Sequence, residues 1–120
     1  MTRTRPLALV LLTATSIFLP PALWAADPAA GAAAWRTTYP QADGAAPRSC
    51  VTCHGTDLTQ AGRQANTGKR IEPMAPSVNS SRLTDPAKVE KWLTRNCRWT
   101  LGRDCTAEEK ADFIAYIQTH

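Results

Sequence analysis

The sequence is poor in several residue types on which many functional sites depend. Its 120 residues include four cysteines, two histidines and two methionines, and aromatic residues make up only 7% of the chain. No segment alternates apolar and polar residues over a useful strand length, and no internal repeat is present. With 43% hydrophobic and 20% charged residues, the composition excludes collagen, a coiled coil and a wholly disordered chain.

Neither sign of charge is concentrated in one part of the chain. The formal net charge is +4, and the basic residues are scattered among acidic ones. A chain that binds nucleic acid usually gathers its lysines and arginines into one patch. We therefore expect no nucleic-acid partner.

Residues 1–25 have the pattern of an export signal peptide. Two arginines precede an apolar run over residues 7–19, and small residues follow at Ala25 and beyond. The run is shorter than the ~20 residues that cross a bilayer, so we expect cleavage after Ala25 and no transmembrane segment in the mature chain. Residues 26–120 would then form one domain in the periplasm, an oxidising compartment in which cysteines pair.

The first half of this domain shows weak secondary-structure patterns. An alanine-rich stretch over residues 27–39 predicts a short helix that ends before Pro40. Residues 55–84 carry several glycines and prolines without periodicity, which predicts a long irregular segment. So long a segment in a small domain needs a packing partner.

A helix that begins after Asp85 is the clearest structural prediction. Asp85 is a candidate N-cap, and a proline follows at the favoured first position. One face of this helix carries Val89, Trp92, Leu93 and Asn96. An asparagine is therefore expected on an apolar face. A last helix should begin at a capping box formed by Thr106 and Glu109.

The five residues Cys50-Val51-Thr52-Cys53-His54 have the C-x-x-C-H spacing of c-type haem attachment. Two thiols three residues apart can add to the two vinyl groups on one edge of a porphyrin, and the adjacent histidine then becomes the proximal iron ligand. The pattern predicts one covalent haem c. Such a haem would also supply the apolar surface that the irregular segment needs.

Two other interpretations of the cysteines are weaker. A thioredoxin-like redox pair requires a βαβ context, which the sequence lacks. A zinc site made of all four cysteines has a plausible number of ligands but leaves His54 without a role.

The irregular segment also offers three basic residues, Arg63, Lys69 and Arg70. These are candidate partners for the carboxylates of a haem. The alternative is that they are solvated surface charges.

The second axial position of the iron has four candidate occupants: Met74, Asn96, His120 or no protein ligand. Met74 is the usual type of distal ligand in electron carriers, but it could equally pack against the porphyrin. His120 is the last residue of the sequence, where fraying is expected. Asn96 is either a ligand or a satisfied polar residue of the core.

The two remaining cysteines, Cys97 and Cys105, enclose a short loop between the last two helices. In an oxidising compartment this pair should form a disulfide. The disulfide would fix the helix end that holds Asn96.

The motif and several later segments closely resemble the sphaeroides haem protein family. The matching residues are 49–55, 67–69, 73, 75–77, 89–93, 95–97 and 102–106. That family consists of small class I cytochromes c in which an asparagine is the distal ligand of the oxidised iron, the reduced iron is high-spin and a cysteine pair forms a disulfide. The resemblance implies an all-α class I cytochrome c fold over residues 26–120 with one covalently attached haem. It also implies Asn96 as distal ligand, a Cys97–Cys105 disulfide, and redox partners among dihaem and membrane b-type cytochromes.

An asparagine ligand has a functional consequence. An amide oxygen is a hard, weak donor that suits ferric iron better than ferrous iron, so reduction should release Asn96. The open ferrous site, facing Trp92 and Leu93, would bind oxygen, nitric oxide or carbon monoxide. We expect a periplasmic monohaem cytochrome that transfers electrons and binds a diatomic ligand when reduced. The alternatives are a low-spin electron carrier with Met74 as permanent ligand, and an enzyme that turns over oxygen or nitric oxide.

Overall fold

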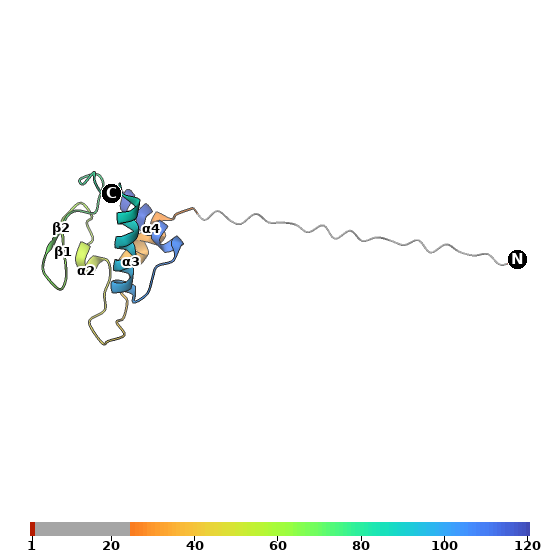
Figure 1. Ribbon diagram of the computed structural model, residues 1–120, viewed down its shortest axis with the longest axis horizontal. Helices are drawn as coiled ribbons and strands as arrows, with labels where there is room; N and C mark the ends of the chain where they lie inside the picture. Colours follow the sequence, from red (N-terminus) through yellow and green to blue (C-terminus); the bar gives the residue numbers. More distant parts are fainter. Residues whose placement is uncertain (2–24) are drawn as a thin grey trace.

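The structure is a computed structural model that describes residue 1 and residues 25–120, so the body of the predicted export signal lies outside the described residues. The elements are α1 (Pro28–Arg36), α2 (Val51–His54), β1 (Gly62–Arg63), β2 (Arg70–Ile71), α3 (Pro86–Leu101) and α4 (Ala107–Gln118) (Figure 1). This mostly helical architecture confirms the predicted fold class. In the described part of the chain, the only sheet is an antiparallel pair in which Gly62 lies opposite Ile71.

Helices α1 and α4 cross at Gly31. A Cβ atom at this position would lie 2.1 Å from the backbone oxygen of Asp112 and 2.9 Å from Cβ of Tyr116, so the crossing requires glycine. Close by, the buried Trp35 ring lies 5.7 Å from the Tyr116 ring and 6.3 Å from the Phe113 ring, measured between centroids. The crossing of the first and last helices expected for a class I cytochrome c is therefore present.

The first helix is shorter than the predicted span of residues 27–39. Thr37 already has extended backbone angles, and Tyr39 exchanges two backbone hydrogen bonds with Arg48, at 2.7 and 3.0 Å. This isolated bridge closes the loop between α1 and α2. Because Tyr39 pairs with Arg48, it cannot continue the helix beyond Arg36.

The predicted starts of the last two helices are confirmed. The Asp85 carboxylate accepts a hydrogen bond from the backbone N–H of Lys88 at 3.1 Å, and α3 begins at Pro86. Thr106 and Glu109 form a reciprocal capping box, with bonds of 3.1 and 2.9 Å. Local side-chain chemistry therefore fixes both helix starts.

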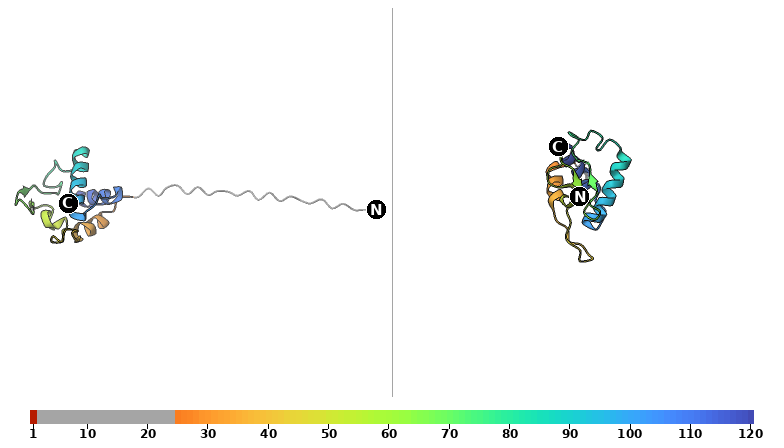
Figure 2. Two further views of the ribbon diagram at one scale, coloured as in Figure 1. Left: turned by 60° about the horizontal axis from the view of Figure 1, so that its bottom comes forward. Right: turned by 90° about the vertical axis from the view of Figure 1, so that its left-hand side faces the viewer.

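Helix α3 is tied to α4 and to the loop that precedes it. A disulfide joins Cys97 to Cys105, as the cysteine count predicts, and Lys110 of α4 donates to the Glu90 carboxylate of α3. Within residues 25–120, α3 packs extensively against neither α1 nor α4, and it runs along one side of the domain (Figure 2). No helix in this part of the chain is long and apolar enough to cross a membrane.

Residues 55–84 are largely irregular, as predicted. The short β1–β2 hairpin was not expected, because two residues per strand are too few to show an alternating pattern. The segment is anchored where Leu58, which is fully buried, accepts a hydrogen bond from the Ala75 backbone N–H at 2.9 Å. Leu58 and Ala75 therefore join the core on either side of the hairpin, whose residues 65–70 are exposed.

Candidate haem site

The C-x-x-C-H motif lies on the single turn of α2 and the residues next to it. Gly55 ends this turn with a φ of 73°, a left-handed conformation that favours glycine, and its carbonyl accepts a hydrogen bond from Trp35 Nε1 at 3.3 Å. On another side, β1 passes so close that a Cβ on Gly62 would lie 2.3 Å from the Cys53 carbonyl oxygen. The motif is thus held by both the core and the hairpin.

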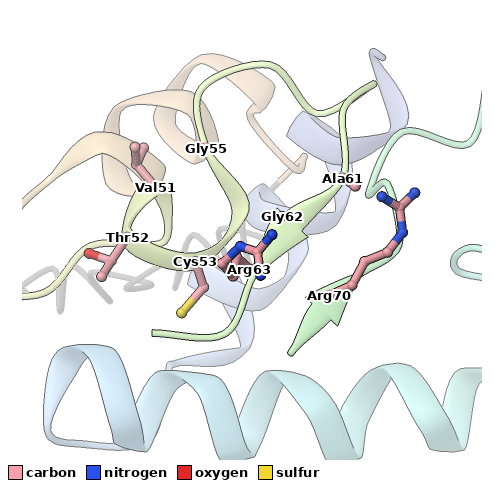
Figure 3. A pocket seen from close by; sticks show the side chains of 8 residues that line it. All are labelled: Val51, Thr52, Cys53, Gly55, Ala61, Gly62, Arg63 and Arg70. Carbon is pink, nitrogen blue, oxygen red and sulfur yellow. The ribbon is translucent and has the colours of Figure 1, made fainter. Parts of the chain in front are cut away.

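Cys50 and Cys53 are half-buried and carry free thiols. In Figure 3 the Cys53 sulfur points away from the hairpin, toward the side on which α3 passes. Burial raises the pKa of the Cys50 thiol to about 12, whereas redox-active C-x-x-C pairs depend on a lowered thiol pKa. The thioredoxin-like interpretation is therefore not supported.

The zinc interpretation is wrong. It required all four cysteines, but Cys97 and Cys105 are consumed by their disulfide. The described residues also contain no cluster of three or more histidine, cysteine, aspartate or glutamate side chains that could hold a metal ion.

His54 is half-buried, and one of its ring nitrogens has no hydrogen-bond partner. Its Nδ1 atom is enclosed and meets no donor or acceptor in residues 25–120, and its ring packs 5.4 Å from the ring of Trp35. Burial, assisted by the positive charge of Arg82, lowers the pKa of His54 to about 4. The ring is therefore neutral at physiological pH, which is the form that binds a metal. An unpartnered neutral imidazole beside two free thiols fits a covalently bound haem.

Two side chains tie the C-terminal turn of α3 to the segment that precedes the motif. Arg48, two residues before the motif, donates from Nη1 to the Trp99 carbonyl at 3.0 Å, and its guanidinium lies 4.3 Å from the centre of the Trp99 ring. Gln41 donates to the Thr100 carbonyl at 3.1 Å. Asn96 lies one helical turn, about 5.4 Å, before these carbonyls. The structure therefore ties the Asn96 end of α3 to the segment that precedes the motif.

Two residues of the α3 face that carries Asn96 are exposed in the described part of the chain. Trp92 is 45% exposed and Asn96 is also exposed. Cys97 and Thr100, on the neighbouring side of the helix, are buried. An exposed indole next to a polar side chain is a surface that another apolar group can cover, so this face also fits a haem.

The other two candidate ligands have different surroundings. Met74 is half-buried and packs against the core cluster that contains Leu58 and Ala75. The fraying expected at His120 is wrong, because its Nδ1 lies 3.0 Å from the Tyr116 carbonyl oxygen and its ring packs edge-on against the Tyr116 ring at 4.8 Å. Both side chains are thus engaged with the protein core or with α4.

The three basic residues of the irregular segment are surface charges. Arg63 donates to the Gly68 carbonyl at 2.7 Å within the hairpin. Arg70 pairs with Glu72 at 3.0 Å, and its guanidinium points away from α3 in Figure 3. Lys69 is exposed. This arrangement agrees with the solvated alternative.

Two cavities adjoin these elements. The larger, of about 350 Å³, is shown in Figure 3 and is lined by Val51, Thr52, Cys53, Gly55, Ala61, Gly62, Arg63 and Arg70. The smaller, of about 240 Å³, is lined by Leu83, Pro86, Val89, Glu90, Leu93, Lys110, Ile114 and Gln118. The first cavity reaches the motif but is lined by no residue of α3, whereas the second lies between α3 and α4.

Sequence reasoning missed two arginines near the site. Arg48 holds the end of α3, as described above, and its position next to the motif was the only clue in the sequence. Arg82 is half-buried and donates to the carbonyl oxygens of Glu72 and Pro73. No local pattern marks Arg82, because its acceptors lie nine and ten residues away in irregular backbone.

Solved structures of two bacterial cytochromes have this fold. The structure of oxidised SHP, described as an oxygen-binding cytochrome c, aligns with a TM-score of 0.71 and 47% identity over 79% of this chain and 83% of that one. Oxidised cytochrome c'' from Methylophilus methylotrophus aligns with a TM-score of 0.71 and 38% identity over 79% and 76% of the two chains. A family model described as a domain of unknown function, DUF1924, matches residues 21–117. The chain is a c-type cytochrome of the DUF1924 family.

Sequence comparison gives the same relatives for this cytochrome. It is 59% identical over 69 residues to cytochrome c-type protein SHP of Cereibacter sphaeroides, covering 58% of this chain and 53% of that protein. It is 46% identical over 71 residues to cytochrome c'' of M. methylotrophus, covering 59% and 49%. The matches span about half the length of each relative. As a close homologue of cytochromes c, the protein is a haem protein with covalent haem c.

Proposed function

We propose that this cytochrome carries one haem c, attached through Cys50 and Cys53 with His54 as proximal ligand, and that it acts in the periplasm after export. It transfers electrons and binds oxygen or nitric oxide in a redox-gated manner. The observation that carries the proposal is the motif itself, in which two free thiols adjoin a half-buried His54 whose enclosed Nδ1 atom has no hydrogen-bond partner. The exposed residues Trp92 and Asn96 of α3 line the opposite side of the haem in this proposal.

Asn96 is the distal ligand in this proposal. A haem bound at this site supplies an iron whose ferric form accepts the hard amide oxygen and whose ferrous form favours a diatomic ligand. The side chain of Asn96 has two roles in this proposal. In the oxidised protein its amide oxygen binds the ferric iron. After the iron releases this oxygen, the N–H₂ group of Asn96 is a hydrogen-bond donor for a bound gas molecule. Trp92, one turn earlier, keeps the vacated space apolar.

The relatives support this proposal. SHP is described as an oxygen-binding cytochrome c, and a solution structure of cytochrome c'' is described as giving insights into haem-ligand detachment. The present chain has an asparagine on α3 rather than a stronger ligand such as histidine. Gas binding after detachment is therefore the function that this site supports best.

The test uses optical spectra of the holoprotein in the ferric and dithionite-reduced states. We expect a high-spin ferrous spectrum that shifts promptly when carbon monoxide or nitric oxide is added. Asn96→Val should open the ferric site to water or external anions without loss of covalent haem. Met74→Leu, a substitution in packed surroundings that costs under about 1.5 kcal/mol, should leave the spectra unchanged.

The competing function is a low-spin electron carrier with Met74 as permanent ligand. It requires a sulfur-to-iron absorption band that Met74→Leu abolishes, together with a ferric spectrum that Asn96→Val does not change. That pair of results would overturn gas binding. Sustained consumption of oxygen or nitric oxide with an electron donor present would instead identify an enzyme, and reduction by dihaem or membrane b-type cytochromes would identify the redox partners.

A further inference from the structure

Helix α3 has few attachments to the half of the chain that carries the motif. Among residues 25–120 it packs extensively against neither α2 nor the hairpin, and its disulfide and ion pairs lead to residues that follow the helix. In this part of the chain, the only hydrogen bonds that join α3 to residues before Asp85 come from Gln41 and Arg48. These two side chains are therefore the hydrogen-bonded link between α3 and the segment that leads into the motif.

Both acceptors of this link belong to the last turn of α3, which ends at Leu101. Arg48 Nη1 donates to the Trp99 carbonyl at 3.0 Å, and Gln41 Nε2 donates to the Thr100 carbonyl at 3.1 Å. The last four carbonyls of a helix have no partner within the helix, and the helix dipole favours a positive charge beside them. The two donors therefore bind acceptors that α3 itself leaves free.

Arg48 is fixed both at its backbone and at its side chain. Its backbone exchanges hydrogen bonds of 2.7 and 3.0 Å with Tyr39, whose carbonyl also accepts a hydrogen bond from Gln41 at 2.9 Å. Its half-buried guanidinium lies 4.3 Å from the centre of the Trp99 ring, an arrangement that suits the planar arginine side chain. Arg48 is therefore a rigid connection rather than a loose surface contact.

The connection is short in sequence at both of its ends. Arg48 precedes Cys50 by two residues, and Trp99 follows Asn96 by three residues, which is about 4.5 Å along the helix axis. A displacement of the contact between Arg48 and Trp99 would therefore move Asn96 relative to the motif. An amide oxygen is a weak ligand for iron, so it cannot pull a displaced helix end back into place.

We propose that Arg48 is a positioning residue that holds Asn96 at the distal side of the haem and thereby sets how easily an external ligand displaces it. This inference rests on the proposed function, in which Asn96 is the ligand of the ferric iron. Arg48 acts through α3 and needs no contact with the iron. The sequence does not mark this role, because Trp99 lies 51 residues later in the chain.

The alternative is that Arg48 only caps α3 and stabilises the fold. Arg36 is a matched control, because it makes the same kinds of contact away from α3. Its Nη1 donates to the Ala32 carbonyl at 3.1 Å, and its guanidinium lies 5.7 Å from the centre of the Tyr116 ring. Arg36→Ala therefore removes a positive charge, a carbonyl hydrogen bond and an aromatic contact without touching the link to α3.

The experiment measures the affinity of the ferric holoprotein for imidazole by optical titration. Alkaline pH keeps this probe uncharged, so that the loss of an arginine charge does not act on it directly. Covalent haem is confirmed first from the absorbance of each denatured protein. Because imidazole must displace Asn96, Arg48→Ala should tighten its binding by about two- to tenfold, the range that corresponds to the net contribution of one hydrogen bond. Arg36→Ala should leave the affinity unchanged.

The same titration in an Asn96→Val background separates positioning from general loosening of the fold. No internal ligand competes with imidazole in that background, so adding Arg48→Ala should have no further effect. A wild-type affinity in Arg48→Ala, or an equal tightening with and without Asn96, would overturn the positioning role and leave Asn96 as the ligand. An Asn96→Val protein with the ferric spectrum and imidazole affinity of wild type would instead overturn the proposed ligand, and this inference with it.

Two milder variants keep the proposal testable if Arg48→Ala does not fold. Gln41→Ala removes the donor to the Thr100 carbonyl and leaves Arg48 on the Trp99 ring, so it should tighten imidazole binding by a smaller factor. Arg48→Lys keeps the charge and a donor but loses the planar stacking, and its affinity should lie between those of wild type and Gln41→Ala/Arg48→Lys. Wild-type affinity in all three of these proteins would refute the positioning role.

Discussion

Replacement of Gly31 by alanine tests how strongly the crossing of α1 and α4 supports the site. The new Cβ would lie 2.1 Å from the Asp112 carbonyl oxygen and 2.6 Å from its carbon, far inside the ordinary contact range of 3.4–4 Å. The obstacle is backbone, so the two helices must separate. Overpacking of this kind costs about 1–3 kcal/mol, and separation also weakens the contacts of Trp35 with Tyr116 and Phe113, at about 0.5–1.5 kcal/mol per aromatic pair. Alanine regains about 1 kcal/mol of helix propensity.

The net expectation for Gly31→Ala is a loss of about 2 kcal/mol in the free energy of unfolding. Thermal unfolding followed by circular dichroism should show Tm lowered by about 8–16 °C. Ala33→Gly, at an exposed position of the same helix, measures the propensity contribution alone and should cost about 1 kcal/mol. A Gly31→Ala protein as stable as wild type, or more stable, would refute the packing argument. Because Trp35 also packs on His54, the same variant should also disturb the position of the His54 ring.

Two further predictions concern the end of α3 and the start of α4. Replacement of Cys97 and Cys105 by serine should lower the free energy of unfolding by about 2–3 kcal/mol, measured by urea titration, and thiol counting on unreduced, denatured wild-type protein should detect neither of these cysteines. Hydrogen bonds from Arg103 and the Thr106 cap lower the pKa of Glu109 from 4.5 to about 2, so Glu109 stabilises the fold above pH 4.5 and loses this effect as the pH falls through 2. Since Arg103 is half-exposed, Glu109→Gln should cost only about 0.5–1 kcal/mol at pH 7, and a difference that persists undiminished at pH 2 would contradict the assignment.

The predictable parts of this molecule are those set by neighbouring residues. The N-cap at Asp85 and the capping box of Thr106 and Glu109 act within three residues, and both appear in the structure where the sequence places them. The disulfide followed from counting the cysteines that the motif leaves over. Each of these features depends on short-range chemistry or on the exclusion of alternatives, which one sequence can supply.

The features that were missed depend on contacts between distant segments. In the sequence, Gly31 only interrupts an alanine-rich helix. In the structure, it is the position of α1 against which the backbone of α4 packs. Pro40 limits the first helix to Tyr39 at most, but the pairing of Tyr39 with Arg48 ends α1 three residues earlier, at Arg36. Arg82 has no periodicity or cap to mark it, since its acceptors are backbone oxygens of an irregular loop. Such close approaches and long-range hydrogen bonds become visible only when the chain is folded.

The contacts around α3 restrict how the proposed release of Asn96 can occur. The residue after it is fixed by the disulfide to Cys105, and the carbonyls one turn later are held by Arg48 and Gln41. Withdrawal of the whole helix end would break both hydrogen bonds and pull Cys105 with it through the disulfide, whereas rotation of the Asn96 side chain disturbs none of the three attachments. On the proposed function, ligand release is therefore a side-chain movement with a fixed backbone. The freed amide would then stay close to the proposed haem site, where it could donate a hydrogen bond to a bound gas molecule.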